Sequence, residues 1–174
     1  MSDNSETTPE IIVEPSILTR EFNAPKQLVF EAWTQVNHLK NWMFPQAGFT
    51  CEYVSAEIKS GGTSLHKMIA PNGFEMWLFT KYEEVSPPDT LVFTQYNSNE
   101  AGDILPNAQM PNWPKELRTT IELEEVDGKT HLKLIWQPIN PTKEEAEAFE
   151  ASRSQHENGW GGGFDQLVIY LKSL

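Results

Sequence analysis

The longest regular spacing of apolar residues lies at the end of the chain, in residues 141–174. Thr142 and Glu145 have the spacing of a capping box, which satisfies free backbone N–H groups where a helix begins. Six residues then recur at steps of three, four or seven and share one helix stripe. They are Phe149, His156, Trp160, Phe164, Leu167 and Leu171. The pattern predicts one long C-terminal helix whose stripe is covered by another large element.

Four glycines crowd around Trp160 inside this predicted helix: Gly159, Gly161, Gly162 and Gly163. Each interior glycine costs about 1 kcal/mol relative to alanine. Either the helix bends or breaks there, or a bulky group such as the sheet or a ligand approaches its backbone closely. We favour the close approach, with bending accompanying it.

Most of the remaining apolar residues alternate with polar ones, which is typical of strands. After a first strand, Pro25 suits the first turn of a short helix, and residues 38–42 indicate a second one. Turn signals then separate six further alternating segments: Gly61-Gly62, Pro71-Asn72-Gly73, Pro87-Pro88-Asp89 and Asp127-Gly128 among them. The predicted strands cover residues 17–23, 49–56, 63–69, 74–85, 90–96, 117–125 and 130–136.

Short turns between successive strands imply one antiparallel sheet of seven strands. A sheet with one apolar face needs a cover, and the C-terminal helix is the only predicted element large enough. The fold class is therefore α+β, with the sheet wrapped around the long helix and two short helices after the first strand. Residues 1–15 are polar and acidic, so we expect a disordered tail, followed by a single domain over residues 16–174.

Composition narrows the possible functions. The formal net charge of −12 opposes binding to nucleic acid or to an anionic membrane surface. No apolar run is long enough to span a membrane, and the N-terminus is unlike a signal peptide, so we expect a cytoplasmic protein without membrane insertion. The single cysteine, Cys51, excludes an internal disulfide, and no Cys/His set with metal spacing accompanies it. We predict neither a metal nor a cofactor.

Candidate catalytic groups are few. A lone histidine on the helix stripe, His156, is more typical of a hydrogen-bonded core residue than of a catalyst, although it could orient the polar end of a ligand. His38, His66 and His131 are expected at exposed positions and suggest no metal site. Paired inward carboxylates for acid–base chemistry are not visible, and neither is a P-loop or a dinucleotide fingerprint. We therefore predict no catalytic residue.

A sheet that grips a helix leaves space between the two, and this chain has more aromatic residues than a small core needs. A pocket with apolar walls and a few polar groups is the usual form of a small-molecule site. The cavity-lining candidates are Trp33, Trp77, Phe93, Trp136, His156, Trp160 and Phe164. Any one of these side chains could instead simply fill the core. The helix stripe and strand alternation favour Trp136, Trp160 and Phe164 as lining residues.

The connection over residues 97–116 is too long for a plain hairpin, and loops of this length often carry function. Its prolines reduce the entropy lost when it becomes ordered. Trp113 offers a large apolar surface without a periodic partner, so it is the candidate lid over the cavity mouth. The alternative to a lid is a flexible insertion whose Trp113 packs on the edge of the sheet.

Several stretches resemble a known family. They are REFNAPKQLVFEAW at residues 20–33, the Gly61-Gly62 turn, Pro71-Asn72-Gly73, EVSPPDTLVFT at 84–94 and GWGGGFDQLVIYL at 159–171. These stretches are similar to the activator of heat-shock protein 90 ATPase homologue family, within the START-like superfamily (SRPBCC) that includes the birch-pollen allergen. The resemblance implies a helix-grip fold and runs over nearly all of residues 17–174.

Three functions remain open. We expect the first, which is non-catalytic binding of a hydrophobic small molecule or lipid in a cavity between sheet and C-terminal helix, by a monomer or weak dimer. The second, implied by the resemblance, is a chaperone-interacting stress-response module. In the family's namesakes chaperone binding also uses a separate N-terminal domain, whereas roughly fifteen residues precede the fold here. The third is an enzyme like the cyclases and hydrolases of the same superfamily.

Overall fold

The computed structural model describes residues 10–174, so most of the expected N-terminal tail lies outside the described residues. Seven strands form one antiparallel sheet in the order β1-β7-β6-β5-β4-β3-β2. The strands are β1 (Ser16–Phe22), β2 (Thr50–Ala56), β3 (Thr63–Ile69), β4 (Glu75–Ser86), β5 (Thr90–Ser98), β6 (Leu117–Val126) and β7 (Lys129–Pro138). The helices are α1 (Lys26–Thr34), α2 (Val36–Leu39), α3 (Lys143–Ala151) and α4 (Arg153–Lys172). This architecture confirms the predicted α+β helix-grip fold.

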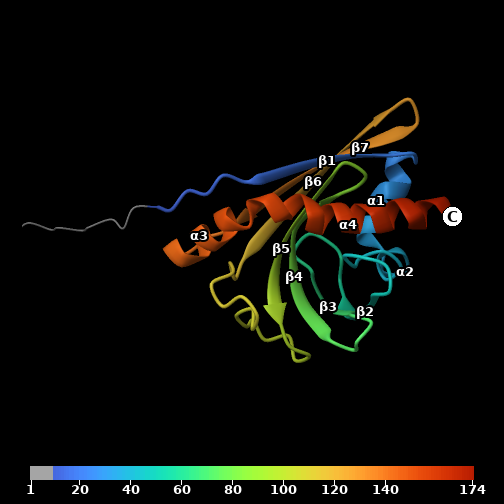
Figure 1. The fold of residues 1–174 in the computed structure, drawn as a ribbon. Coiled ribbons are helices and arrows are strands. Elements are labelled where there is room, and N and C mark those ends of the chain that lie inside the picture. The colour runs from blue at the N-terminus through green and yellow to red at the C-terminus, as the bar shows by residue number, and fades with distance from the viewer. Residues whose placement is uncertain (1–9) are drawn as a thin grey trace, which may run out of the picture.

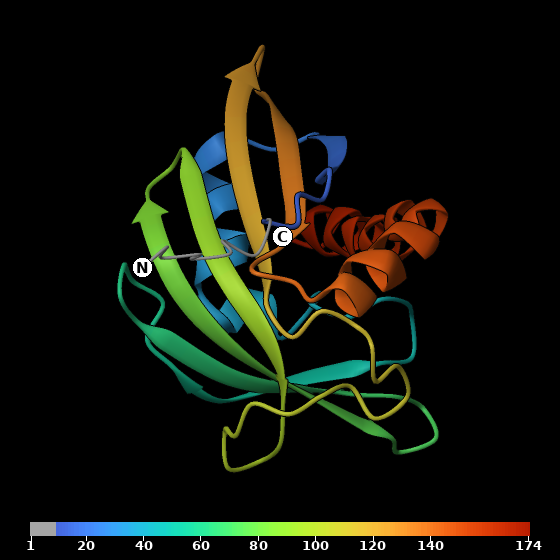
Figure 2. The ribbon, with the colours of Figure 1, turned by 90° about the vertical axis from the view of Figure 1, so that its left-hand side faces the viewer.

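The sheet bends into a deep trough, and α4 lies across its open side (Figures 1 and 2). Two irregularities in strand pairing help the sheet to bend: the register shifts between Tyr53 and Ser55 in β2 and between Tyr82 and Glu84 in β4. Helices α1 and α2 lie at one end of the trough, between the sheet and α4. The open side of the trough is therefore covered by α4, with the two short helices at one end.

The apolar core lies where α1, the sheet and the second half of α4 meet. Side chains from all three parts are almost completely buried there, and Phe22 meets Phe164 edge to face with ring centroids 6.1 Å apart. Members of this core include Phe22, Val29, Leu39, Trp42, Leu91, Ile121, Leu132, Leu134, Phe164 and Leu167. The core therefore anchors the second half of α4 to the sheet, whereas the first turns of α4 lie outside this core.

The C-terminal region differs from the predicted single helix. Its start is as expected, since the Thr142 hydroxyl accepts a hydrogen bond from the Glu145 N–H. The helix then ends at Ala151, and a new one begins at Arg153. The hydroxyl of Ser152 donates to the carbonyl of Ala148 at 3.1 Å, a contact that competes with regular helix bonding and often bends helices. The break thus falls at a serine, while the four glycines lie within the unbroken helix α4.

Candidate functional site

A cavity of about 420 Å³ lies between the concave face of the sheet and the first half of α4. Its sheet-side wall includes His66 and Met68 of β3, Met76 and Leu78 of β4, and Gln95 of β5. These residues share one face because cross-strand partners point the same way: His66 pairs with Leu78, and Met68 with Met76. The rest of the wall comes from Trp42, Met43, Phe44, Pro45, Met110, Trp113, Trp136, Ser152, Gln155, His156, Gly159, Trp160 and Gly163.

Methionine is concentrated in this wall. The chain has five methionines, and the four beyond Met1 all line the cavity: Met43, Met68, Met76 and Met110. They come from four separate segments of the chain, so the fold alone brings them together. Methionine is flexible and polarisable and adapts to irregular shapes. The cavity therefore has a wall that can adjust to its contents.

Four of the residues predicted from sequence lie together in the cavity wall: Trp113, Trp136, His156 and Trp160. Trp136 is at their centre, with its ring centroid 5.0 Å from that of His156, 5.8 Å from Trp113 and 5.9 Å from Trp160. Trp113 also packs on Phe149 of α3, at 6.1 Å between centroids. The lid candidate thus has aromatic partners from β7, α3 and α4, which the sequence pattern did not show.

The other four predicted residues do not line the cavity. Trp33, Phe93 and Phe164 are buried in the adjoining core, where they fill space between α1, the sheet and α4. Trp77 lies on the opposite face of β4 from its neighbours Met76 and Leu78, and Lys67 places its ammonium 5.2 Å from the Trp77 ring centroid. Which aromatic residues fill the core, and which face of β4 points inward, are set by how several elements pack together. The sequence pattern alone did not show either result.

The four glycines of α4 have different surroundings. A Cβ added at Gly162 would lie 2.2 Å from the carbonyl oxygen of Pro45, so only glycine fits this contact. The predicted close approach is therefore found at this position, and the approaching group is the segment before β2. Gly159 and Gly163 belong to the cavity wall, and a Cβ added at either meets nothing within 4 Å. Their missing side chains leave room on the cavity side of α4.

His66 is a buried residue of the wall, with 1 % of its surface exposed. The expectation that it would be exposed is wrong, because His66 shares the inner face of β3 with Ser64 and Met68. Its ring stacks on Tyr53 at 4.7 Å between centroids. Among the described residues, no group hydrogen-bonds to either ring nitrogen. Burial lowers the pKa of His66 to about 4, so its imidazole is uncharged at neutral pH.

His156, by contrast, has both nitrogens occupied. The Ser16 hydroxyl lies 2.5 Å from Nδ1 and the Ser152 hydroxyl 3.1 Å from Nε2. Burial, followed by the nearby Arg153 guanidinium, lowers the pKa of His156. This residue therefore behaves as a hydrogen-bonded structural histidine that ties β1 to α4. It lines the cavity but has no ring nitrogen free to bind a ligand.

The remaining histidines lie elsewhere. His38 is half-buried and bonds through Nδ1 to the Tyr170 hydroxyl at 2.7 Å, and His131 is exposed beside Glu21. Across residues 10–174, no group of three or more His, Cys, Asp or Glu side chains is arranged to hold a metal ion. The helices in the same range include none with the length and hydropathy needed to cross a membrane.

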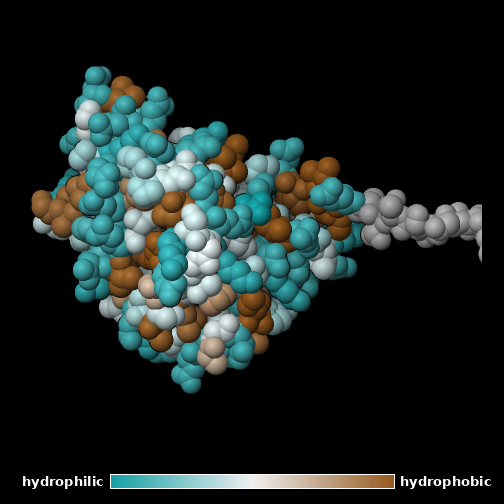
Figure 3. Space-filling model, turned by 180° about the vertical axis from the view of Figure 1, so that it is seen from behind, coloured by the Kyte–Doolittle hydropathy of each residue, from teal (hydrophilic) through white to brown (hydrophobic). Residues whose placement is uncertain are grey.

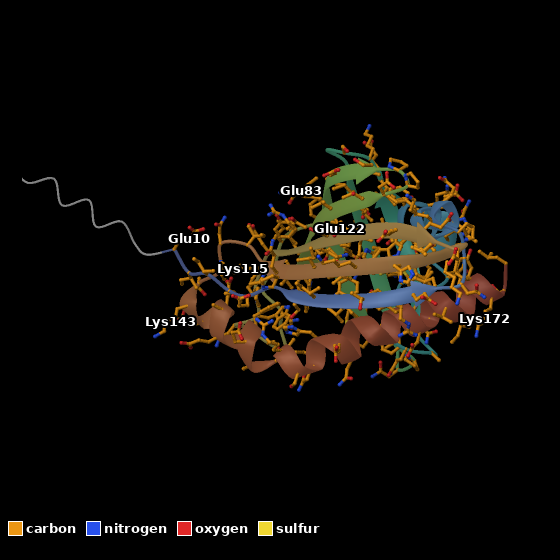
Figure 4. The ribbon with its side chains drawn as sticks, turned by 90° about the horizontal axis from the view of Figure 1, so that it is seen from above. Glu10, Glu83, Lys115, Glu122, Lys143 and Lys172 are labelled. Atoms are coloured by element: carbon orange, nitrogen blue, oxygen red, sulfur yellow. The ribbon has the colours of Figure 1, made fainter. Side chains whose placement is uncertain are left out.

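Charge is kept outside the cavity. Its wall contains no Lys, Arg, Asp or Glu, and its polar side chains are those of His66, Gln95, Ser152, Gln155 and His156. The charged residues labelled in Figure 4 lie around the periphery of the fold instead. A second depression of about 610 Å³ lies over β1, β6 and β7 and carries mixed charges such as Arg20, Glu122 and Lys133. Most of its side chains are exposed and several are charged, so the uncharged cavity is the better candidate site.

Comparison with known proteins agrees with the resemblance seen in the sequence. The profile of the family described as Activator of Hsp90 ATPase homolog 1-like protein matches residues 23–172. No curated protein matches the chain. Among solved structures, a protein from Staphylococcus epidermidis is 23% identical, with a TM-score of 0.74 over 94% of this chain and 93% of that one.

Two further solved structures have the same fold. A protein from Arthrobacter aurescens is 20% identical, with a TM-score of 0.74 over 91% of this chain and 86% of that one. The AHSA1 protein from Silicibacter pomeroyi is 17% identical, with a TM-score of 0.68 over 91% of this chain and 97% of that one. At these identities the likeness concerns the fold alone.

Proposed function

Because the chain belongs to the family of Activator of Hsp90 ATPase homolog 1-like proteins, we propose that it binds a small, largely apolar molecule in the cavity between the sheet and α4. The observation that carries the proposal is the cavity itself, about 420 Å³ in volume and without a charged side chain in its wall. Small-molecule sites commonly enclose about 300–1,000 Å³ and combine apolar walls with a few polar groups. The four methionines support this function, since an adaptable wall can close around a ligand.

One face of the molecule supports cavity binding over the chaperone-interacting alternative. A surface that docks another protein is commonly a continuous apolar patch. On the face shown in Figure 3, apolar residues form separate spots among hydrophilic ones. The cavity wall, in contrast, gathers apolar side chains from several elements in one place.

A leucine at position 163 is expected to block the cavity. Gly163 belongs to the wall, and the new side chain has open space to grow into. We expect the uncharged fluorescent probe N-phenyl-1-naphthylamine to bind the natural protein and to bind Gly163→Leu at least about tenfold more weakly, a loss of roughly 1.4 kcal/mol. Fluorescence titration measures both affinities.

The matched control is Gly161→Leu. Gly161 lies in the same helix and equally has no atom within 4 Å of an added Cβ, but it is not part of the wall. This variant should bind the probe like the natural protein. Equal affinities of Gly163→Leu and Gly161→Leu, with both folded, would place probe binding outside the cavity and refute the proposal.

We further propose that Trp113 acts as the lid over one end of this cavity. The half-buried indole packs on Trp136 and Phe149, and its segment lies between β5 and β6.

Replacing Trp113 with Ala should accelerate probe release more than entry, since affinity differences within one site lie mostly in the off-rate. Stopped-flow fluorescence measures both rates, with Trp77→Ala on the outer sheet face as control. A release rate equal to that of the control would remove the lid, as would unchanged hydrogen exchange over residues 97–116 on binding.

A further inference from the structure

Three buried side chains of the cavity wall, those of Trp42, His66 and His156, carry a ring nitrogen that can form hydrogen bonds, and they differ in one respect. The Trp42 indole N–H donates to the Ala32 carbonyl at 2.9 Å, and both nitrogens of His156 meet serine hydroxyls. His66 alone has no hydrogen-bonding partner within residues 10–174, although its side chain is just as buried. Resting on the proposed function, we propose that the ligand is an uncharged molecule whose hydroxyl group hydrogen-bonds to the imidazole of His66.

The imidazole is held in a fixed position by its neighbours. Its ring stacks on Tyr53, with an angle of 19° between the ring planes, and β3 positions it between its cross-strand partners on β2 and β4. A neutral imidazole offers one N–H donor and one bare nitrogen acceptor. A buried polar group without a partner has lost its hydrogen bonds to water and gained none in return. A ligand that satisfies His66 therefore gains affinity that a purely apolar ligand does not.

The chemistry of the wall favours an uncharged polar group that can either donate or accept, and a hydroxyl is the simplest such group. A hydroxyl can donate to the bare nitrogen or accept from the N–H, so it suits either tautomer of His66. A carboxylate would need a cationic partner, and an ammonium an anionic one, but the wall holds no charged side chain. Burial keeps His66 itself uncharged, because it lowers the pKa of the imidazole to about 4. An ionised ligand would thus lose its hydration without compensation.

The test compares three probes that share one ring system: 2-naphthol, 2-methylnaphthalene and 2-naphthoate. Calorimetric titration at neutral pH should show that 2-naphthol binds about tenfold more tightly than 2-methylnaphthalene, and that the anionic 2-naphthoate binds most weakly. In His66→Phe, which keeps a flat ring, the first two affinities should become equal. The exposed His131 provides the control, and His131→Phe should keep the tenfold difference.

The outcomes separate this inference from the function on which it rests. Equal affinities of the natural protein for 2-naphthol and 2-methylnaphthalene overturn the role of His66 and leave cavity binding in place. Binding of 2-naphthoate as tight as that of 2-naphthol overturns the selection for an uncharged ligand. If none of the probes binds, the proposed function itself is refuted.

A second measurement needs no variant and is informative even where His66→Phe fails to fold. Nitrogen-15 NMR of the natural protein reports the tautomer and hydrogen bonding of the His66 ring. Saturation with 2-naphthol should shift the ring nitrogen signals of His66, whereas 2-methylnaphthalene should leave them nearly unchanged. Ring signals that do not move while 2-naphthol is bound overturn the inference.

Discussion

Replacing Gly162 with alanine is expected to destabilise the protein by about 2 kcal/mol, although a glycine-to-alanine change inside a helix normally stabilises by about 1 kcal/mol. The new Cβ would lie 2.2 Å from the Pro45 carbonyl oxygen. Because that neighbour is backbone, the segment around Pro45 and α4 must move apart. The same segment supplies Met43 and Phe44 to the cavity wall, so the change should also loosen the cavity.

Gly161→Ala is the matched control and should have the opposite sign. Its added Cβ meets nothing within 4 Å, so only the gain in helix propensity of about 1 kcal/mol remains. Urea unfolding followed by circular dichroism measures both changes. Two variants that shift stability in the same direction would show that the contact between Gly162 and Pro45 does not control the position of α4.

Acid is expected to remove about 3 kcal/mol of stability through His66 alone. In the folded protein burial lowers its pKa from 6.5 to about 4, so the unfolded chain takes up a proton first as the pH falls. The contribution of uncharged, buried His66 to the free energy of unfolding is therefore complete above pH 6.5 and is lost between pH 6.5 and about 4. Each unit of difference in pKa corresponds to about 1.4 kcal/mol.

His66→Phe isolates this effect. The free energy of unfolding should be measured for both proteins between neutral pH and pH 4, where the carboxylates contribute equally to both. The difference between the two curves should change by about 3 kcal/mol over that interval. Curves that stay parallel would mean that His66 is protonated as readily in the folded protein as in the unfolded chain.

The turn signals and alternation were sufficient to predict the fold, because both are local. Glycine, proline and asparagine turns separate strands that pair with their sequence neighbours, apart from β1, which pairs with β7. The break at Ser152 was not predictable in the same way. Ser152 bonds to the carbonyls of Ala148 and Phe149 and also meets His156, and a serine at this spacing bends some helices and leaves others straight.

The cavity could be predicted only in part. In β4 both faces are apolar, since Met76 and Leu78 alternate with Trp77 and Phe79, so the sequence did not reveal which pair faces inward. In β3 the inner position is a histidine and its apolar neighbour Leu65 is buried as well, so alternation along the strand did not mark His66 as an inward-facing residue. The inward face of both strands depends on contacts with distant elements.

The most direct test of cavity binding is native mass spectrometry of the protein purified from its own host. The central claim predicts a species heavier than the bare chain by the mass of one small molecule. The same species should be absent from Gly163→Leu, whose cavity is filled, and present in Gly161→Leu. Observing only the bare chain in the natural protein, or the same retained molecule in Gly163→Leu, would contradict the claim.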